Sequence, residues 1–176
     1  MKPNHPILSL FLTLTLWLVG AADPLVVAHR GGTELGPENR METFRRALEL
    51  KVDAIELDVH RSADGVLFVI HDSTLTRTFG VEGTVNRMTA ADLSKLGVPT
   101  LREAFTLVGD RARLVVEVKA DEPGLEETLV ALLEEFRLLE SAIVISFHRR
   151  PLAELHRIRP ALATGFLYGS TESNPA

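Results

Sequence analysis

The sequence has no cysteine and fewer basic than acidic residues, and each of these shortages excludes a class of function. Without cysteine there are no disulfides, thiolate nucleophiles or zinc–thiolate sites, so oxygen or imidazole must hold any metal. The formal net charge of −5 argues against a nucleic-acid-binding protein, which normally carries a basic surface. With 45% hydrophobic residues among 176, the chain still has enough apolar material for a globular core.

Long apolar runs are also scarce, and the one that stands out lies near the N-terminus. Lys2 and His5 precede an apolar run at 7–19, and small residues follow at 20–22. This order is typical of a secretory signal peptide, and the run is shorter than the ~20 residues of a comfortable transmembrane helix. We therefore predict a signal peptide over 1–22, removed to leave an exported, periplasmic or extracellular domain without a membrane span. An uncleaved membrane anchor is the alternative.

The stretch 55–72 carries the densest set of candidate site residues. It predicts two strands around a turn at 63–65, and side chains alternate between the two faces of a strand. Glu56 and Asp58 therefore share one face, while the apolar residues between and beside them face the other way. Two carboxylates placed in this way need a metal ion, a substrate cation or a basic side chain nearby. A tight hairpin would set His71 roughly opposite Glu56.

Strands and helices alternate along the rest of the chain. We expect short strands at 25–28, 114–119, 142–148 and 164–168, and helices beginning at 37–39 and spanning 90–96, 100–108, 124–139 and 151–157. This alternation indicates βαβ units and a largely parallel sheet, hence an α/β protein. The charged residues gather where strands end, which is the active-site edge of a β/α barrel. An open doubly wound sheet uses the same edge, but the chain lacks a Gly-x-Gly-x-x-Gly fingerprint.

Three carboxylates at these strand ends, those of Glu56, Asp58 and Glu117, are candidate metal ligands. Hard oxygen ligands of this type suit Mg²⁺ or Ca²⁺ better than Zn²⁺. The alternative is that each carboxylate pairs with a basic residue such as Lys119. Three carboxylates on one rim favour the metal, because so much buried negative charge calls for a divalent counter-ion.

Two histidines and two cations fall on the same rim. His29 and His71 could be hydrogen-bonded core residues, but a pair of imidazoles also suits general acid and base catalysis. Arg30 and Lys119 could simply pair with the acids, or they could hold an anionic substrate. A divalent ion, cations and two imidazoles together predict chemistry on a phosphate ester. One imidazole would deprotonate the nucleophile and the other would protonate the leaving alkoxide.

The order of short motifs along the chain is similar to that of a known family. The motifs are His29-Arg30-Gly31, Pro37-Glu38-Asn39, Glu56-Leu57-Asp58-Val59, Asp64-Gly65, His71-Asp72, Pro99-Thr100-Leu101 and Glu117-Val118-Lys119. This ordered set resembles the glycerophosphodiester phosphodiesterase family from about 26 to 119, and more loosely to 168. The resemblance implies a TIM-type (β/α) barrel of the phospholipase-C-like phosphodiesterase kind. It also implies hydrolysis of a small glycerophosphodiester to glycerol 3-phosphate and an alcohol.

The resemblance also implies roles for individual residues. Glu56, Asp58 and Glu117 look like ligands of a Ca²⁺ or Mg²⁺ cofactor, and His29 and His71 look like the acid/base pair. Arg30 and Lys119, in the same motifs, look like phosphate-binding residues.

Chain length and substrate class lead to further expectations. An eight-stranded barrel typically takes ~250 residues, so we expect the domain over 23–176 to be truncated after about its sixth strand. Two alternative functions remain open from the sequence. One is a lysophospholipase D or another lipid phosphodiesterase on the same fold. The other is an incomplete domain that binds metal and phosphate esters without turnover.

Overall fold

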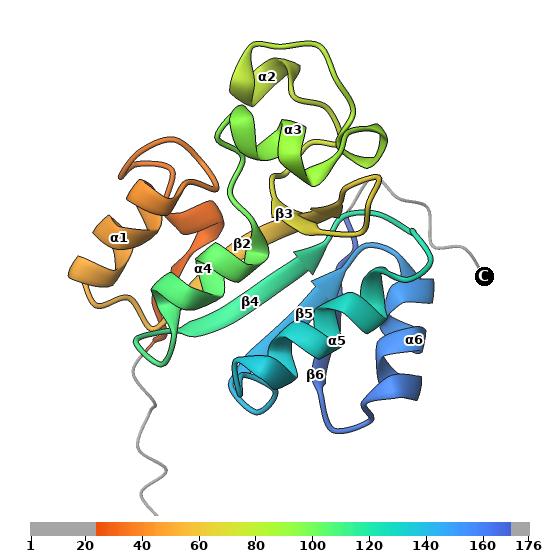
Figure 1. The fold of residues 1–176 in the computed structure, drawn as a ribbon. Helices are drawn as coiled ribbons and strands as arrows, with labels where there is room; N and C mark the ends of the chain where they lie inside the picture. The colour runs from red at the N-terminus through yellow and green to blue at the C-terminus, as the bar shows by residue number, and fades with distance from the viewer. Residues whose placement is uncertain (1–23, 170–176) are drawn as a thin grey trace, which may run out of the picture.

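The computed structural model describes residues 24–169, so the signal peptide predicted over 1–22 lies outside the described part (Figure 1). A parallel sheet runs in the order β1 (Val27–Ala28), β2 (Ala54–Arg61), β4 (Arg113–Val118), β5 (Ala142–Ser146) and β6 (Ala163–Phe166). A short strand, β3 (Leu67–Val69), pairs with β2 in the antiparallel direction. The predicted parallel α/β sheet is thus confirmed. Its two outer strands, β1 and β6, do not pair with each other within 24–169.

The helices form two groups in the chain. Those that connect parallel strands are α1 (Met41–Glu49), α4 (Leu101–Val108), α5 (Leu125–Glu135) and α6 (Arg149–Ile158). Between β3 and α4 lie α2 (Thr76–Phe79), a 3₁₀ turn η2 (Val85–Arg87) and α3 (Ala90–Lys95), and another 3₁₀ turn, η1 (His29–Gly31), follows β1. Figure 1 shows α2 and α3 standing apart from the other helices. No helix within 24–169 combines the length and apolar character needed to cross a bilayer.

The main hydrophobic core lies between one face of the sheet and the connecting helices. The alternation predicted for β2 holds, because Ile55, Leu57 and Val59 are fully buried in this core. Phe44 of α1 and Phe105 of α4 pack into the same core. The polar side chains of Glu56 and Asp58 therefore lie on the opposite face of β2, where the site forms.

The segment 73–98, which we call the lobe, has a small core of its own. Leu75, Val85 and Leu93 are fully buried there and pack with Phe68 and Ile70 at the base of the lobe. The lobe therefore packs around β3 and the residue after it, not around the connecting helices. The predicted helix at 90–96 is confirmed as α3.

Two local predictions are wrong. The first connecting helix begins at Met41, not at 37–39, because Arg40 still has an extended backbone and Asn39 has a left-handed one with φ 54°. The residues 37–39 are thus free to contribute to the site.

The connection between β2 and β3 is wider than a tight hairpin. Residues 62–66 join the two strands, and Val59 pairs with Val69. Continuing this register would place His71 level with Leu57 and not with Glu56, and β3 itself ends before His71. The imidazole therefore approaches the carboxylates from beyond the end of the strand.

Candidate active site

Three carboxylates from two neighbouring strands meet on the face of the sheet opposite the main core. Asp58 of β2 lies in register with Glu117 of β4, and Glu56 is two residues earlier on the same face of β2. One carboxylate oxygen of each residue lies within 4.8 Å of the others, and all three residues are buried. The parallel register of β2 and β4 therefore builds this acidic cluster, as the alternation of side chains requires.

The acidic cluster has the chemistry of a site for a hard divalent cation. Oε1 of Glu56 and Oδ1 of Asp58 are buried and accept no hydrogen bond within 24–169. Burial and the neighbouring Asp58 carboxylate raise the pKa of Glu56 to about 7. Three close carboxylates form the all-oxygen donor set that Mg²⁺ and Ca²⁺ prefer. The three residues therefore fit such an ion.

Backbone and side-chain donors from 30–39 hold the outer oxygens of the acidic cluster. The backbone N–H of Arg30 donates to Oε2 of Glu56 at 2.7 Å, with Arg30 in a left-handed conformation at φ 51°. The Asn39 amide donates to Oδ2 of Asp58 at 2.8 Å, and its oxygen accepts the Asp58 backbone N–H. The Arg30 guanidinium lies 3.6 Å from Oδ2 of Asp58. These contacts orient the two carboxylates and leave one oxygen of each free.

Lys119 follows the end of β4 and connects the acidic cluster to a histidine. Its Nζ lies 2.7 Å from Oε1 of Glu117, 3.6 Å from Oδ1 of Asp58 and 3.1 Å from Nε2 of His71. Because a lysine ammonium can only donate, Nε2 of His71 accepts in this contact. The other ring nitrogen, Nδ1, lies 2.7 Å from Oδ1 of Asp72. The imidazole therefore carries its proton on Nδ1 and presents a lone pair on Nε2.

His29 is placed more loosely than His71. Its side chain is 65% exposed, in the turn after β1, and its Nε2 lies 3.9 Å from Oε2 of Glu56. The two histidines thus flank the acidic cluster in different environments, with one held on both sides of its ring and the other open to solvent. All seven residues that the sequence singled out surround this one site.

Comparison with known proteins gives the family. The model of the glycerophosphoryl diester phosphodiesterase family matches residues 29–174, which include every residue of the site just described. The chain belongs to this family. The resemblance found in the sequence motifs is thereby confirmed.

Individual family members match over most of the chain. A glycerophosphodiester phosphodiesterase of Caldanaerobacter subterraneus is 40% identical over 161 residues, which are 82% of this chain. A solved structure of a glycerophosphodiester phosphodiesterase from Agrobacterium tumefaciens superposes with a TM-score of 0.72 at 30% identity, covering 80% of this chain and 65% of that one. A phosphodiesterase from Oleispira antarctica, solved with its product sn-glycerol-3-phosphate, superposes with a TM-score of 0.74 at 27% identity. The match covers 86% of this chain and 68% of that one.

This chain spans only part of its curated relatives. The match covers 66% of the Caldanaerobacter protein and 58% of a glycerophosphodiester phosphodiesterase from Bacillus subtilis, which is 34% identical and matches 80% of this chain.

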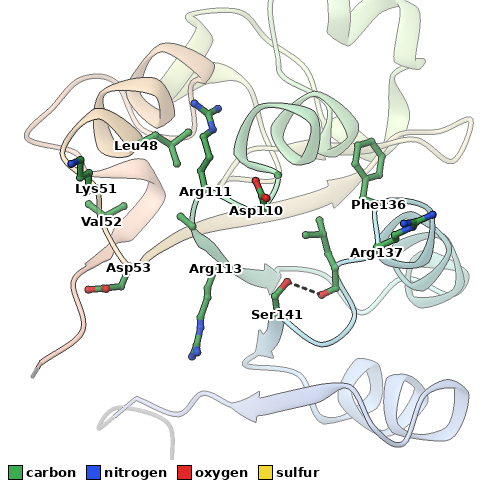
Figure 2. A pocket seen from close by; sticks show the side chains of 13 residues that line it. Leu48, Lys51, Val52, Asp53, Asp110, Arg111, Arg113, Phe136, Arg137 and Ser141 are labelled. Carbon is green, nitrogen blue, oxygen red and sulfur yellow. Dashed lines mark hydrogen bonds between the residues drawn. The ribbon is translucent and has the colours of Figure 1, made fainter. Parts of the chain in front are cut away.

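The acidic cluster together with His29, Arg30, His71 and Lys119 is called the family site below. A hollow of about 820 Å³ lies at the opposite edge of the sheet from it. It is lined by residues that precede or begin strands, among them Asp53 before β2 and Arg113 at the start of β4. In Figure 2 the Arg111 and Arg113 side chains point away from each other, so these cations do not converge on a common point. The hollow therefore lacks the converging groups that mark the family site.

Sequence reasoning assigned no role to several residues that support the family site. Asn39 holds Asp58, but the Pro37-Glu38-Asn39 motif alone predicts no role for its amide. Asp72 directly follows His71, and this spacing could have identified it as a partner of the imidazole. Glu38 and Arg77, which pair beside the site, lie 39 positions apart, and no local pattern relates them.

Proposed function

We propose that the protein is a metal-dependent phosphodiesterase that hydrolyses small glycerophosphodiesters to glycerol 3-phosphate and an alcohol. The observation that carries this proposal is the acidic cluster of Glu56, Asp58 and Glu117 with Lys119 and His71 in direct contact around it. The similarity to glycerophosphodiester phosphodiesterases and the sn-glycerol-3-phosphate bound to the Oleispira enzyme support the substrate class.

Glu56 and Asp58 would hold Ca²⁺ or Mg²⁺ through their unpaired oxygens, with Glu117 as the third ligand. Once bound, the ion supplies positive charge that stabilises the negative charge developing on the phosphoryl oxygens. Arg30 and Lys119 lie against the acidic cluster and would contact further phosphoryl oxygens, the first with a planar fork and the second as a point charge. Their placement supports binding of a diester at this edge of the sheet.

We assign the general base to His71 and the general acid to His29. The Nε2 lone pair of His71 accepts from Lys119 in the structure. Once Lys119 contacts the phosphoryl oxygens instead, this lone pair can take a proton from the attacking water or substrate hydroxyl, while Asp72 stabilises the imidazolium that forms. Protonated His29 can give its proton to the oxygen of the departing alcohol as the phosphorus–oxygen bond breaks. Its exposure at the rim leaves room for an alcohol group that extends into solvent.

The experiment is release of glycerol 3-phosphate from glycerophosphocholine by the purified chain with Ca²⁺, Mg²⁺ or EDTA. We expect metal-dependent release, and loss of a general base should lower kcat about 10²–10⁴-fold in His71→Ala. Arg113→Ala removes a cation at the far end of β4 and is the matched control. Release that persists in EDTA, or an unchanged rate in His71→Ala, would contradict the proposal.

We also propose that the chain is exported and that residues 1–22 are removed. Support comes from the order of charged, apolar and small residues in this stretch. The intact mass of secreted material gives the test, because a product that starts at Met1 would exclude cleavage.

A further inference from the structure

Arg77 lies in the lobe, outside the strands that carry the acidic cluster, yet it contacts two acidic residues beside the family site. Its Nε lies 2.6 Å from Oδ2 of Asp72, and its two terminal nitrogens lie 2.9 and 2.7 Å from the two Glu38 oxygens. The hydrogen bonds from Arg77 lower the pKa of both carboxyl groups. Both carboxylates therefore stay charged across the neutral range.

Each of these two carboxylates holds a residue of the proposed machinery. Asp72 accepts from Nδ1 of His71 at 2.7 Å, and Glu38 accepts from the Arg30 guanidinium at 3.2 Å. Arg77 is thus the middle of a continuous chain of charge-assisted contacts that runs from His71 to Arg30. The lobe contributes Arg77 to this chain. At one end Arg30 lies against Asp58 of the acidic cluster, and at the other end His71 contacts Lys119, which contacts Glu117.

We propose that Arg77 is a positioning residue, which fixes the His71 imidazole through Asp72 and ties it through Glu38 to Arg30. Its catalytic consequence rests on the proposed function, whereas its effect on His71 does not. Asp72 is adjacent to His71 in the chain and is partly exposed, so without a second partner it can turn toward solvent. The guanidinium fork grips Asp72 and Glu38 at once, which a lysine ammonium cannot match in geometry.

The simpler alternative is that these contacts are surface ion pairs without influence on the site. The chain offers a matched control for it, because Arg102 makes a two-pronged contact with Glu135 and is 53% exposed, close to the 49% of Arg77. Arg102 and Glu135 join α4 to α5 and do not belong to the family site. Replacing Arg102 should therefore reproduce any effect that is due only to losing an exposed arginine–carboxylate pair.

The first measurement uses nuclear magnetic resonance of the histidine side chains and needs no turnover. The Nδ1 proton of His71, assigned with His71→Gln, should resonate downfield in the wild type because it bonds to a carboxylate. We expect this signal to be lost or moved upfield in Arg77→Ala, and to stay in place in Arg102→Ala. An unmoved signal in Arg77→Ala would overturn the proposal whether or not the protein is an enzyme.

The second measurement is steady-state hydrolysis of glycerophosphocholine with Ca²⁺. Arg77→Ala should lower kcat about 10–100-fold with little change in KM, as expected when a reacting group loses its orientation. Added guanidinium ion should restore part of the rate to Arg77→Ala and none to His71→Ala. Equal rates for Arg77→Ala and Arg102→Ala would overturn the catalytic part, and an inactive wild type would count against the proposed function instead.

Arg77→Lys keeps the test valid if the alanine variant does not fold. It retains the charge but cannot contact both carboxylates with a planar fork, so we expect a smaller loss of kcat and a displaced His71 signal. Melting temperatures of all variants identify any that are simply unfolded. A lysine variant with wild-type rate and spectrum would show that charge alone suffices and would overturn the positioning role of the fork.

Discussion

Lys119 and His71 face each other across 3.1 Å, from Nζ to Nε2, although they lie 48 positions apart in the chain. Asp72 contacts the other ring nitrogen, so a cation holds one side of the imidazole and an anion holds the other. This arrangement fixes both the plane of the ring and the nitrogen that carries the proton. Lys119 also touches Glu117, so a change in the acidic cluster reaches His71 through one side chain.

Removing Lys119 should therefore affect catalysis more than folding. In Lys119→Ala we expect kcat/KM for glycerophosphocholine to fall at least about 100-fold, because the donor that we propose for the phosphoryl group is lost. Steady-state kinetics with saturating Ca²⁺ measures the effect. Arg113→Ala is the control, since Arg113 lies at the other end of the same strand and makes no ion pair within 24–169. A loss below tenfold in Lys119→Ala would leave this residue with a structural role only.

Replacing Glu56 should remove most of the stabilisation by metal. A ligand that binds the native state stabilises it by RT ln(1 + [L]/Kd), or about 2.7 kcal/mol at 100 times Kd. The wild type should thus melt several degrees higher in Ca²⁺ or Mg²⁺ than in EDTA, and Glu56→Gln should show little of this shift. Thermal unfolding gives the comparison, and equal metal-induced shifts in both proteins would exclude Glu56 as a ligand.

Between about pH 4.5 and 7, Glu56 should make the metal-free protein less stable as the pH rises. Burial raises the pKa of Glu56 from 4.5 to about 7, so the folded state keeps a proton up to a higher pH than the unfolded chain does. The resulting stabilisation is complete below pH 4.5 and disappears as the pH passes 7, a change of about 3 kcal/mol. Urea unfolding in EDTA at several pH values measures it. Glu56→Gln should flatten this part of the curve, and parallel curves for the two proteins would refute the assignment.

Lys51 offers a test of backbone strain far from the family site. It follows α1 with φ 58°, a left-handed conformation that costs a residue with a side chain about 1 kcal/mol and that glycine adopts freely. Lys51→Gly should therefore raise the free energy of unfolding by about 0.5–1 kcal/mol, whereas Lys51→Ala should not. Urea unfolding measures both, with unchanged turnover as the companion result. A destabilised glycine variant would mean that the lysine charge at the helix end matters more than the strain.

Much of the acidic cluster could be predicted because it depends on local periodicity. Glu56 and Asp58 share a face through simple alternation along β2, and the parallel register with β4 then places Glu117 beside them. The start of the helix predicted over 100–108 could also be predicted, because its signal is local: α4 begins at Leu101, directly after Thr100, which forms a capping box with Glu103.

Other parts of the site depend on contacts between distant segments, and the sequence could not provide them. The helix predicted at 37–39 fails because Asn39 turns its amide toward Asp58, an interaction across 19 positions that overrides local helix signals. The pairing of Arg77 with Glu38 likewise arises only when the lobe folds against the rest of the chain. Exposure of His29 also required the structure, because the residue type alone fits a core position as well as a rim.

Because the lobe has a core of its own, the family site is assembled from two separately packed parts, the parallel sheet and the lobe. The sheet supplies the carboxylates, while Ile70, the residue before His71, is packed into the lobe together with Leu75. A chimera that receives 68–98 from another family member would therefore inherit the donor's residues at His71, Asp72 and Arg77, while the acidic cluster and Lys119 would stay those of the host. Substitutions in 68–98 would therefore change the surroundings of the proposed general base while leaving the acidic cluster as it is.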